Sequence, residues 1–168
     1  MSQDAAASFA GLYRTYARDV YRFALYLSGD AALAEDITSE TFLRIWQAEG
    51  SLRLSTVKSF LLVIARNLYL HEQRRISRSR PLDDSHAAGE SLARNLEAQQ
   101  ELDRTVEALQ LLPEVDRAAL LLRVVEELPY REIAEVLHLS VAAAKVKVHR
   151  ARLHLAEHLQ RSRTHASH

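Results

Sequence analysis

Large apolar side chains recur every three or four residues along most of the chain, which is the spacing of an amphipathic helix. Stretches that alternate between apolar and polar residues, as half-buried strands do, are short. The pattern therefore predicts an all-α fold class. The expected helices cover residues 8–27, 30–47, 58–75, 92–112, a segment that Pro113 opens, residues 130–137, and a last helix that begins after Ser140.

Two interruptions of this pattern divide the chain. Residues 48–57 surround Gly50 and Ser51 and are expected to form a loop between the second and third helices. Residues 76–91 contain Ser, Arg, Asp and Gly together with the first proline, Pro81, which is a composition typical of a linker. We therefore expect two small helical domains, residues 1–75 and 92–168, joined by a flexible linker over residues 76–91.

The last two expected helices are separated by only three residues, His138, Leu139 and Ser140, and Ser140 is well suited to cap the helix that follows it. Lys147 and Arg150 are expected to project from the side of that helix opposite its apolar stripe. A short helix, a tight turn and a longer basic helix are typical of a helix-turn-helix, although an antiparallel helix pair with a solvated basic face fits the same pattern. The stripe consists of Val141, Ala144, Val148, Ala151, Leu155 and Leu159.

The charge of the chain is informative only when it is counted segment by segment. The 168 residues include 22 basic and 22 acidic side chains, so the net charge is zero. Residues 58–80 carry six basic and one acidic side chain, as do residues 140–163, and each segment therefore has a net charge of +5. Residues 81–139 have a net charge of −8. Two basic segments in an otherwise acidic chain indicate either two contacts with a polyanion or two solvated faces.

Other chemistry is sparse. The absence of cysteine excludes disulfides, thiolate metal sites and cysteine nucleophiles. The run from His71 begins like a zinc-protease motif but has Arg75 where the second histidine belongs. His149, His154 and His158 have helical spacing, yet we expect no metal, no cofactor, no catalytic residue and no small-molecule substrate. Without a signal peptide or a long apolar run, the chain is expected to be cytoplasmic and not inserted in a membrane.

Several runs of residues together resemble bacterial sigma factors of the extracytoplasmic-function (ECF) group. In the first half, residues 34–46 look like the family's helix that binds core RNA polymerase. Residues 60–68, followed by Arg74 and Arg75, look like its helix that engages the −10 promoter element. The second half resembles the −35-binding domain at residues 112–114, 120–123, 130–135 and 149–152. The resemblance covers about residues 9–75 and 105–160, in the family's order around a linker.

The resemblance implies a function and a set of partners. A protein of this kind gives core RNA polymerase its promoter specificity, and it is commonly held inactive by an anti-sigma factor. The domain at residues 1–75 would bind the polymerase and melt the −10 element, and the domain at residues 92–168 would hold the −35 element. Catalysis would belong to the polymerase, so the chain itself is not expected to be an enzyme.

Three groups of site residues follow from the resemblance. Three of the polymerase-binding residues have i, i+3, i+4 spacing and share one helix face, which without the family would be an ordinary acidic solvent face. The residues implied in core polymerase binding are Asp36, Ser39, Glu40 and Trp46. Those implied at the −10 element are Arg53, Lys58, Arg66, Asn67, Arg74 and Arg75. Those implied at the −35 element are Ser140, Ala142, Ala143, Lys145, Val146, Lys147, His149 and Arg150.

The chain departs from the family's usual residues at several of these places. Ser39 stands where a glutamine is usual, and His138 stands where a turn glycine is usual, so the turn is expected to hold a side chain in a left-handed conformation. Ala142, Ala143 and Val146 offer no side-chain hydrogen bonds. Readout of the −35 element should therefore depend on the cations of that helix, on apolar contact and on DNA shape.

Two other interpretations remain open from the sequence. A two-domain helix-turn-helix regulator would bind DNA without the polymerase. A helical scaffold would bind only protein. Binding to core polymerase separates the first interpretation from both alternatives, and DNA binding in the absence of polymerase separates the alternatives from each other.

Overall fold

The computed structural model describes residues 3–48, 56–79 and 96–166, which contain seven α-helices and no strand. The predicted all-α class is thereby confirmed. The chain divides into two compact units, Met1–Ala88 and Gly89–His168. Within the described ranges, every helix is too short or too polar to span a membrane.

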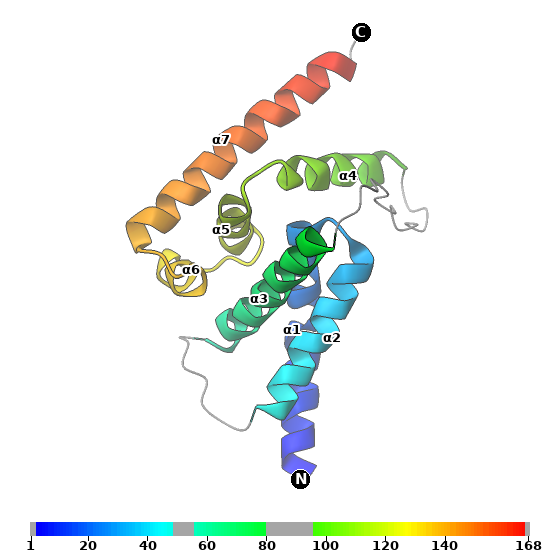
Figure 1. Cartoon of the computed structure of the whole chain (residues 1–168), viewed down its shortest axis with the longest axis vertical. Coiled ribbons are helices and arrows are strands. Elements are labelled where there is room, and N and C mark those ends of the chain that lie inside the picture. Colours follow the sequence, from blue (N-terminus) through cyan, green and yellow to red (C-terminus); the bar gives the residue numbers. More distant parts are fainter. Residues whose placement is uncertain (1–2, 49–55, 80–95, 167–168) are drawn as a thin grey trace. The chain divides into compact units, whose positions relative to one another are not determined.

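Unit 1 is a bundle of three helices, α1 (Gln3–Ser28), α2 (Ala31–Gln47) and α3 (Val57–Arg78), each of which packs on the other two (Figure 1). Two helices are longer than the sequence predicts. α1 begins before residue 8, and α3 continues past residue 75 to end at Arg78, with the N–H of the following Ser79 donating to the carbonyl oxygen of Arg75 at 3.2 Å. The core of the bundle includes Val20, Phe23, Leu27, Ile37, Phe42, Leu61, Leu62 and Ala65.

The linker expected at residues 76–91 is therefore wrong at its start. Residues 76–78 belong to α3, where Glu72 and Arg75 form an ion pair one turn apart that suits a continuous helix. Residues 80–91 lie outside the described part of the chain. The helix expected at residues 92–112 is observed as α4 (Leu96–Gln110), and residues 92–95 also lie outside the described part.

Short polar side chains fix where the helices of unit 1 begin. Asp30 Oδ1 accepts a hydrogen bond from the N–H of Leu33 at 3.1 Å at the start of α2. Thr56 Oγ1 accepts one from the N–H of Ser59 at 3.1 Å at the start of α3. Each bond satisfies a backbone donor that the first helical turn leaves without a partner.

Unit 2 is built around its last helix. It contains α4, α5 (Glu114–Val124), α6 (Tyr130–Leu137) and α7 (Val141–Ala166), and α7 packs against each of the other three (Figure 1). α5 ends at Val124, whose side chain is 52% exposed. The core includes Ala118, Leu122, Ile133, Val136, Ala144, Val148 and Ala151.

The turn between α6 and α7 has the conformation that the sequence predicts. His138 is left-handed, with φ 54° and ψ 45°, and this lets the N–H of Leu139 donate to the carbonyl oxygen of Ala134 at 2.9 Å. Ser140 Oγ accepts a hydrogen bond from the N–H of Ala143 at 3.0 Å. The predicted left-handed turn and the predicted cap are both confirmed.

Candidate polymerase and nucleic-acid interfaces

One side of α2 carries the residues expected to bind the polymerase. Asp36 and Ser39 are exposed, and Glu40 is half-buried with its Oε1 3.1 Å from Nε of Arg44. Leu43, three residues after Glu40, is on the same side and 47% exposed. Sequence reasoning missed Leu43, although its spacing from Asp36 and Glu40 would have indicated it.

An aromatic cluster adjoins the end of α2. Trp46 is 36% exposed, and its ring centroid lies 4.8 Å from that of Phe9 in an edge-on contact. The ring of Tyr13, which is 47% exposed, makes a similar contact with Phe42 at 4.9 Å. Because Tyr13 belongs to α1, its place beside α2 depends on how the two helices pack, and no local sequence signal could have found it.

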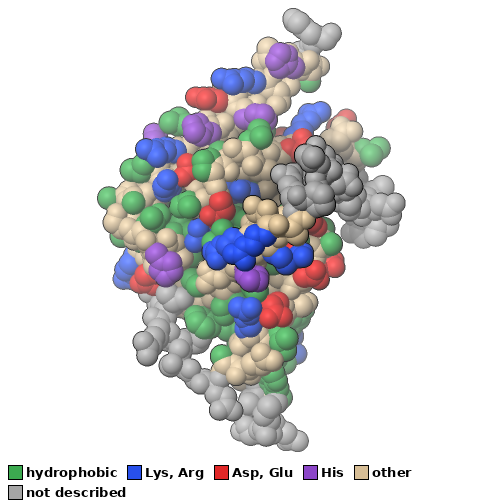
Figure 2. Space-filling view, viewed as in Figure 1, with side chains coloured by type: hydrophobic (Ala, Val, Ile, Leu, Met, Phe, Trp, Pro, Cys, Tyr) green, Lys and Arg blue, Asp and Glu red, His purple; other side chains and the backbone are tan. Residues whose placement is uncertain are grey.

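The C-terminal end of α3 presents a group of cations. Arg74, Arg75 and Arg78 are exposed and, with His71 and Ser79, line a shallow hollow of about 360 Å³. Figure 2 shows Lys and Arg side chains gathered over this part of α3. We call these three arginines the α3 cluster. Their exposure suits contact with phosphate groups.

One member of the α3 cluster already has an acidic partner. Arg75 donates to Glu72 through Nη2 at 2.6 Å and through Nε at 3.0 Å. This hydrogen bonding is the main cause that holds the pKa of Glu72 below its usual value, and it raises the pKa of Arg75. Arg75 is therefore less available to a phosphate than its two neighbours.

The other residues expected at the −10 element have different surroundings. Asn67 is exposed. Lys58 is half-buried, with Nζ 3.8 Å from Oδ2 of Asp19 on α1. Arg66 is buried, with only 9% of its surface exposed, so it cannot reach a phosphate from this position, contrary to the expectation. Arg53 lies outside the described residues.

The start of α7 exposes most of the residues expected at the −35 element. The larger side chains in this group are Lys145, Val146, His149 and Arg150. Ala143 is half-buried, and the hydroxyl of Ser140 is occupied in capping the helix. The exposed members of the set are Ser140, Ala142, Lys145, Val146, His149 and Arg150.

Lys145 is one of two cations that flank a tyrosine ring. Its Nζ lies 5.6 Å from the ring centroid of Tyr130, and Cζ of Arg123 lies 4.5 Å from the same centroid. The side chains come from α7, α5 and α6, so the ring brings two positive charges together beside the turn. Sequence reasoning missed Arg123 because its contact with Tyr130 exists only in the folded unit.

Lys147 does not point where the sequence predicts. Its Nζ lies 3.2 Å from Oδ1 of Asp116 on α5, a side chain that is only 4% exposed. The two groups are close enough to form an ion pair, although Oδ1 of Asp116 accepts no hydrogen bond within the described structure. The ammonium group is therefore directed toward α5, and the expectation that Lys147 projects from the side opposite the packed stripe is wrong.

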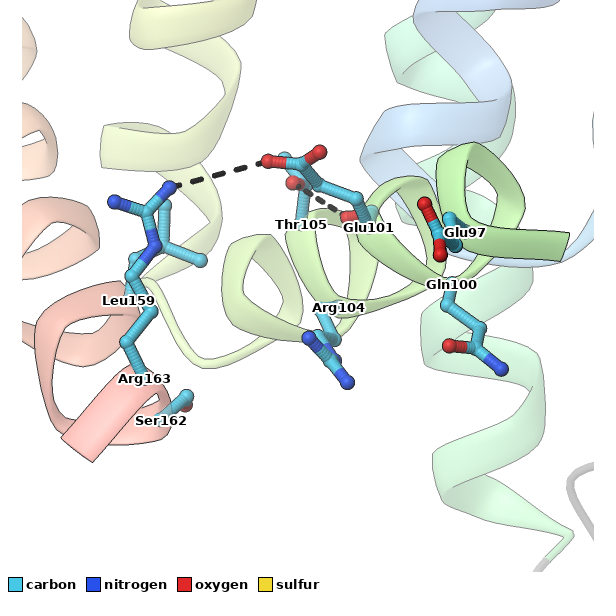
Figure 3. A pocket seen from close by; sticks show the side chains of 8 residues that line it. All are labelled: Glu97, Gln100, Glu101, Arg104, Thr105, Leu159, Ser162 and Arg163. Atoms are coloured by element: carbon cyan, nitrogen blue, oxygen red, sulfur yellow. Dashed lines mark hydrogen bonds and ion pairs between the residues drawn. The ribbon is translucent and has the colours of Figure 1, made fainter. Parts of the chain in front are cut away.

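A cleft of about 310 Å³ marks where α4 packs on the distal half of α7 (Figure 3). Arg163 reaches from α7 toward Glu101 of α4, with Nη2 3.9 Å from Oε1, and both side chains are largely exposed. An exposed pair of this kind contributes little to stability. The cleft is lined by Glu97, Gln100, Glu101, Arg104, Thr105, Leu159, Ser162 and Arg163, none of which belongs to the expected interfaces.

Two family models match the chain, one in each unit. Residues 12–79 match sigma-70 region 2, and residues 102–155 match sigma-70 region 4. The first match covers the described helices of unit 1 from within α1 to the end of α3. The second extends from α4 into α7 and includes the helix-turn-helix.

Proteins and solved structures similar to the chain carry related names. The chain is 34% identical over 163 residues to the ECF RNA polymerase sigma factor SigE of Mycolicibacterium smegmatis, covering 94% of this chain and 63% of that protein. It is 33% identical over 150 residues to the ECF RNA polymerase sigma factor SigM of Bacillus subtilis, covering 86% of this chain and 90% of that protein. The fold is similar to that of the sigma factor RpoE in complex with the anti-sigma factor NepR from Bartonella quintana, with a TM-score of 0.73, 24% identity, and coverage of 91% of this chain and 97% of that one. It is also similar to CnrH in complex with the cytosolic domain of CnrY, with a TM-score of 0.71, 22% identity, and coverage of 92% and 89%.

Proposed function

The chain belongs to the ECF sigma factors of the sigma-70 family, and from this premise we propose that its two units divide the work of promoter-specific initiation. Unit 1 binds core RNA polymerase and engages the −10 element, and unit 2 holds the −35 element. The observation that carries the proposal is that each unit exposes the chemistry its share of the work requires. Unit 1 presents an acidic and aromatic surface beside a cationic helix end, and unit 2 presents a capped, basic recognition helix.

Polymerase binding is assigned to the side of α2 that carries Asp36, Ser39, Glu40 and Leu43, together with Trp46. Two acidic side chains, one exposed and one half-buried, on the helix that carries a large aromatic ring suit a basic partner surface, because the charges steer the encounter and the ring supplies buried area. Within unit 1 the α3 cluster lies on a different helix. The polymerase and the DNA therefore need not compete for the same side chains.

DNA contact is assigned to two helices. In unit 1 the α3 cluster and Asn67 meet the −10 element, where exposed cations replace the counterions of the phosphates. In unit 2 the first turns of α7 enter the major groove of the −35 element, with Arg150 and Lys145 as the cations and with Ala142 and Val146 close to the bases. Small apolar side chains at these positions permit close approach and favour contact with thymine methyl groups.

Regulation is assigned to an anti-sigma partner, and reaction chemistry to the polymerase. The two similar structures are of RpoE bound to the anti-sigma factor NepR and of CnrH bound to the cytosolic domain of CnrY. A partner of this kind would act here by covering the acidic side of α2, the recognition helix, or both. The chain would work in the cytoplasm without catalytic activity of its own.

The polymerase-binding surface can be tested by charge reversal. The double variant Asp36→Lys, Glu40→Lys should lose about 100-fold or more in affinity for core polymerase, because close like charges at an interface cost several kcal/mol. The matched control is Asp103→Lys, Glu107→Lys, which reverses two exposed charges at the same spacing on α4 of the other unit. Binding is measured by titration of labelled core polymerase, and run-off transcription on a promoter set gives the functional readout. Normal assembly of the first variant with core would remove the α2 assignment.

A further inference from the structure

Lys147 is half-buried, and its head group is directed into unit 2. Its side chain is 30% exposed, whereas the Asp116 side chain beneath it is 4% exposed. In the described part of the chain, Lys147 is the only cation that forms an ion pair with Asp116. The buried carboxylate therefore depends on α7 for its counter-charge.

The start of α5 explains why Asp116 takes its partner from another helix. Asp116 is the third residue of α5, a position from which an acidic side chain commonly accepts a hydrogen bond from the N–H of the capping residue. Here the capping residue is Pro113, which has no N–H. Because the local donor is missing and burial of an unpaired carboxylate is unfavourable, the ammonium group of Lys147 becomes the carboxylate's partner.

The apolar side chains that α7 buries fully are small. The fully buried part of α7 consists of Ala144, Val148 and Ala151, which are small side chains. Small side chains allow close approach of two helices, but they form shallow ridges and so resist sliding and rotation less than large ones. Lys147 lies at the edge of this stripe, three residues from Ala144 and four from Ala151, where an ion pair to a second helix restrains the rotation directly.

We propose that Lys147 is a positioning residue for −35 recognition. Through Asp116 it fixes the rotation of α7 so that Arg150 and Val146 face the DNA, and its ammonium group does not neutralise a phosphate. This inference rests on the proposed function of α7 in DNA binding. It removes Lys147 from the set of direct contacts that the sequence predicts.

The salt dependence of promoter binding separates a positioning role from a phosphate contact. In holoenzyme assembled from the full chain and core polymerase, Lys147→Ala should lower promoter affinity about tenfold at every salt concentration, with an unchanged slope of log affinity against log salt. Arg150→Ala should reduce the magnitude of that slope by about 0.9, the value for one phosphate contact. A slope change of that size for Lys147→Ala would overturn the proposal.

A second pair of variants distinguishes positioning from simple stabilisation of the fold. Asp116→Leu with Lys147→Met replaces a buried ion pair by apolar residues, an exchange that often preserves stability. We expect the midpoint of thermal unfolding to return to within about 3 °C of wild type, with discrimination against a substituted −35 element still reduced several-fold. Lys147→Arg keeps the charge and should keep the discrimination. Full recovery of discrimination in the apolar double variant would overturn the proposal.

The same measurements report separately on the proposed function. If Arg150→Ala leaves promoter affinity and salt dependence unchanged, α7 does not contact DNA, whatever the Lys147 variants show. If Arg150→Ala behaves as expected and the Lys147 variants do not, the DNA-binding function stands and only the positioning role fails.

Discussion

Each unit contains one lysine of a basic segment that pairs with an aspartate on a neighbouring helix, and the two pairs differ in their surroundings. In unit 1, Lys58 lies 3.8 Å from Asp19, and both side chains are about one-quarter exposed, at 24% and 25%. Asp19 also accepts a hydrogen bond from Arg22 at 3.0 Å. In unit 2, Lys147 lies 3.2 Å from Asp116, which is 4% exposed and has no second cation in the described structure.

The difference shows that equal net charge does not mean equal use of charge. Both basic segments have a net charge of +5, and the sequence assigned both lysines to DNA contact. A pair that water and a second cation can reach is worth at most about 1 kcal/mol. Removing one partner of a buried pair costs about 3 kcal/mol or more, because the remaining charge is left without compensation. One cation of the second basic segment, Lys147, therefore stabilises the fold of its own unit.

The largest expected effect is a difference between two alanine variants. Lys147→Ala should lower the free energy of unfolding of unit 2 by about 3 kcal/mol, and Lys58→Ala should lower that of unit 1 by less than about 1 kcal/mol. The chain has a single tryptophan, Trp46, which packs on Phe9 in unit 1. Urea unfolding followed by Trp46 fluorescence therefore reports unit 1, and far-ultraviolet circular dichroism reports both units.

These two probes also provide the control for each variant. Lys147→Ala should shift the circular dichroism transition and leave the fluorescence transition in place. Equal losses of stability for the two lysine variants would contradict the contrast between the buried and the exposed pair.

A second experiment examines the cations that unit 1 leaves on its surface. Arg74→Ala with Arg78→Ala removes two exposed members of the α3 cluster, so the slope of log promoter affinity against log salt should fall in magnitude by about 1.8. Urea unfolding followed by Trp46 fluorescence should not change. Arg161→Ala, an exposed arginine in the distal part of α7, serves as a control that should leave the slope unchanged. An unchanged slope for the double variant would remove the α3 cluster from the DNA interface.

The features that the sequence predicted correctly are those that depend on near neighbours in the chain. The helical spacing, the cap at Ser140 and the left-handed turn at His138 each involve residues within about five positions of one another. Helix ends were less well predicted. α3 runs past Arg75 because the residues between Arg75 and Pro81 include no proline or glycine that would end it. The ion pair between Glu72 and Arg75 also forms within a continuous helix, and helix ends are in general hard to place from sequence.

The direction of a long side chain at the edge of a buried stripe could not be predicted in this way. The position of Lys147 on α7 lies between the packed side and the solvent side, and its four-carbon stem can direct the charge either way. Asp116, 31 residues earlier, decides the direction. The burial of Arg66 and the place of Tyr13 beside α2 likewise depend on packing between helices, about which a single sequence contains little information.

A smaller effect is expected at the turn that precedes α7. His138 is exposed and left-handed, a conformation that costs a residue with a Cβ atom about 1–2 kcal/mol. Glycine removes that cost but gains freedom in the unfolded chain, so His138→Gly should stabilise unit 2 by about 0.5 kcal/mol. The circular dichroism transition in urea measures the change, and His138→Ala, which keeps a Cβ atom, should show no gain. A loss of stability in the glycine variant would mean that the imidazole contributes more than the strain it causes.

The smallest expected effect concerns the one acidic side chain in the first basic segment. Glu72 holds Arg75 through two hydrogen bonds, and its lowered pKa keeps it ionised at neutral pH. A carboxyl group with a lowered pKa contributes stability above its usual pKa of 4.5, and this contribution is lost as the pH falls through the lowered value. Promoter binding between about pH 6 and 8 should therefore show no titration from this pair.

Glu72→Gln should release Arg75 to the DNA and so raise the magnitude of the salt slope by up to about 0.9, the opposite of the change expected for Arg74→Ala with Arg78→Ala. Glu97→Gln removes one exposed negative charge on α4 in the other unit and provides the control for net charge. Weaker promoter binding by Glu72→Gln would show that the carboxylate orients Arg75 for the phosphate. In that case the exposed pair in unit 1 would orient one arginine, just as we propose that the buried pair in unit 2 orients the whole of α7.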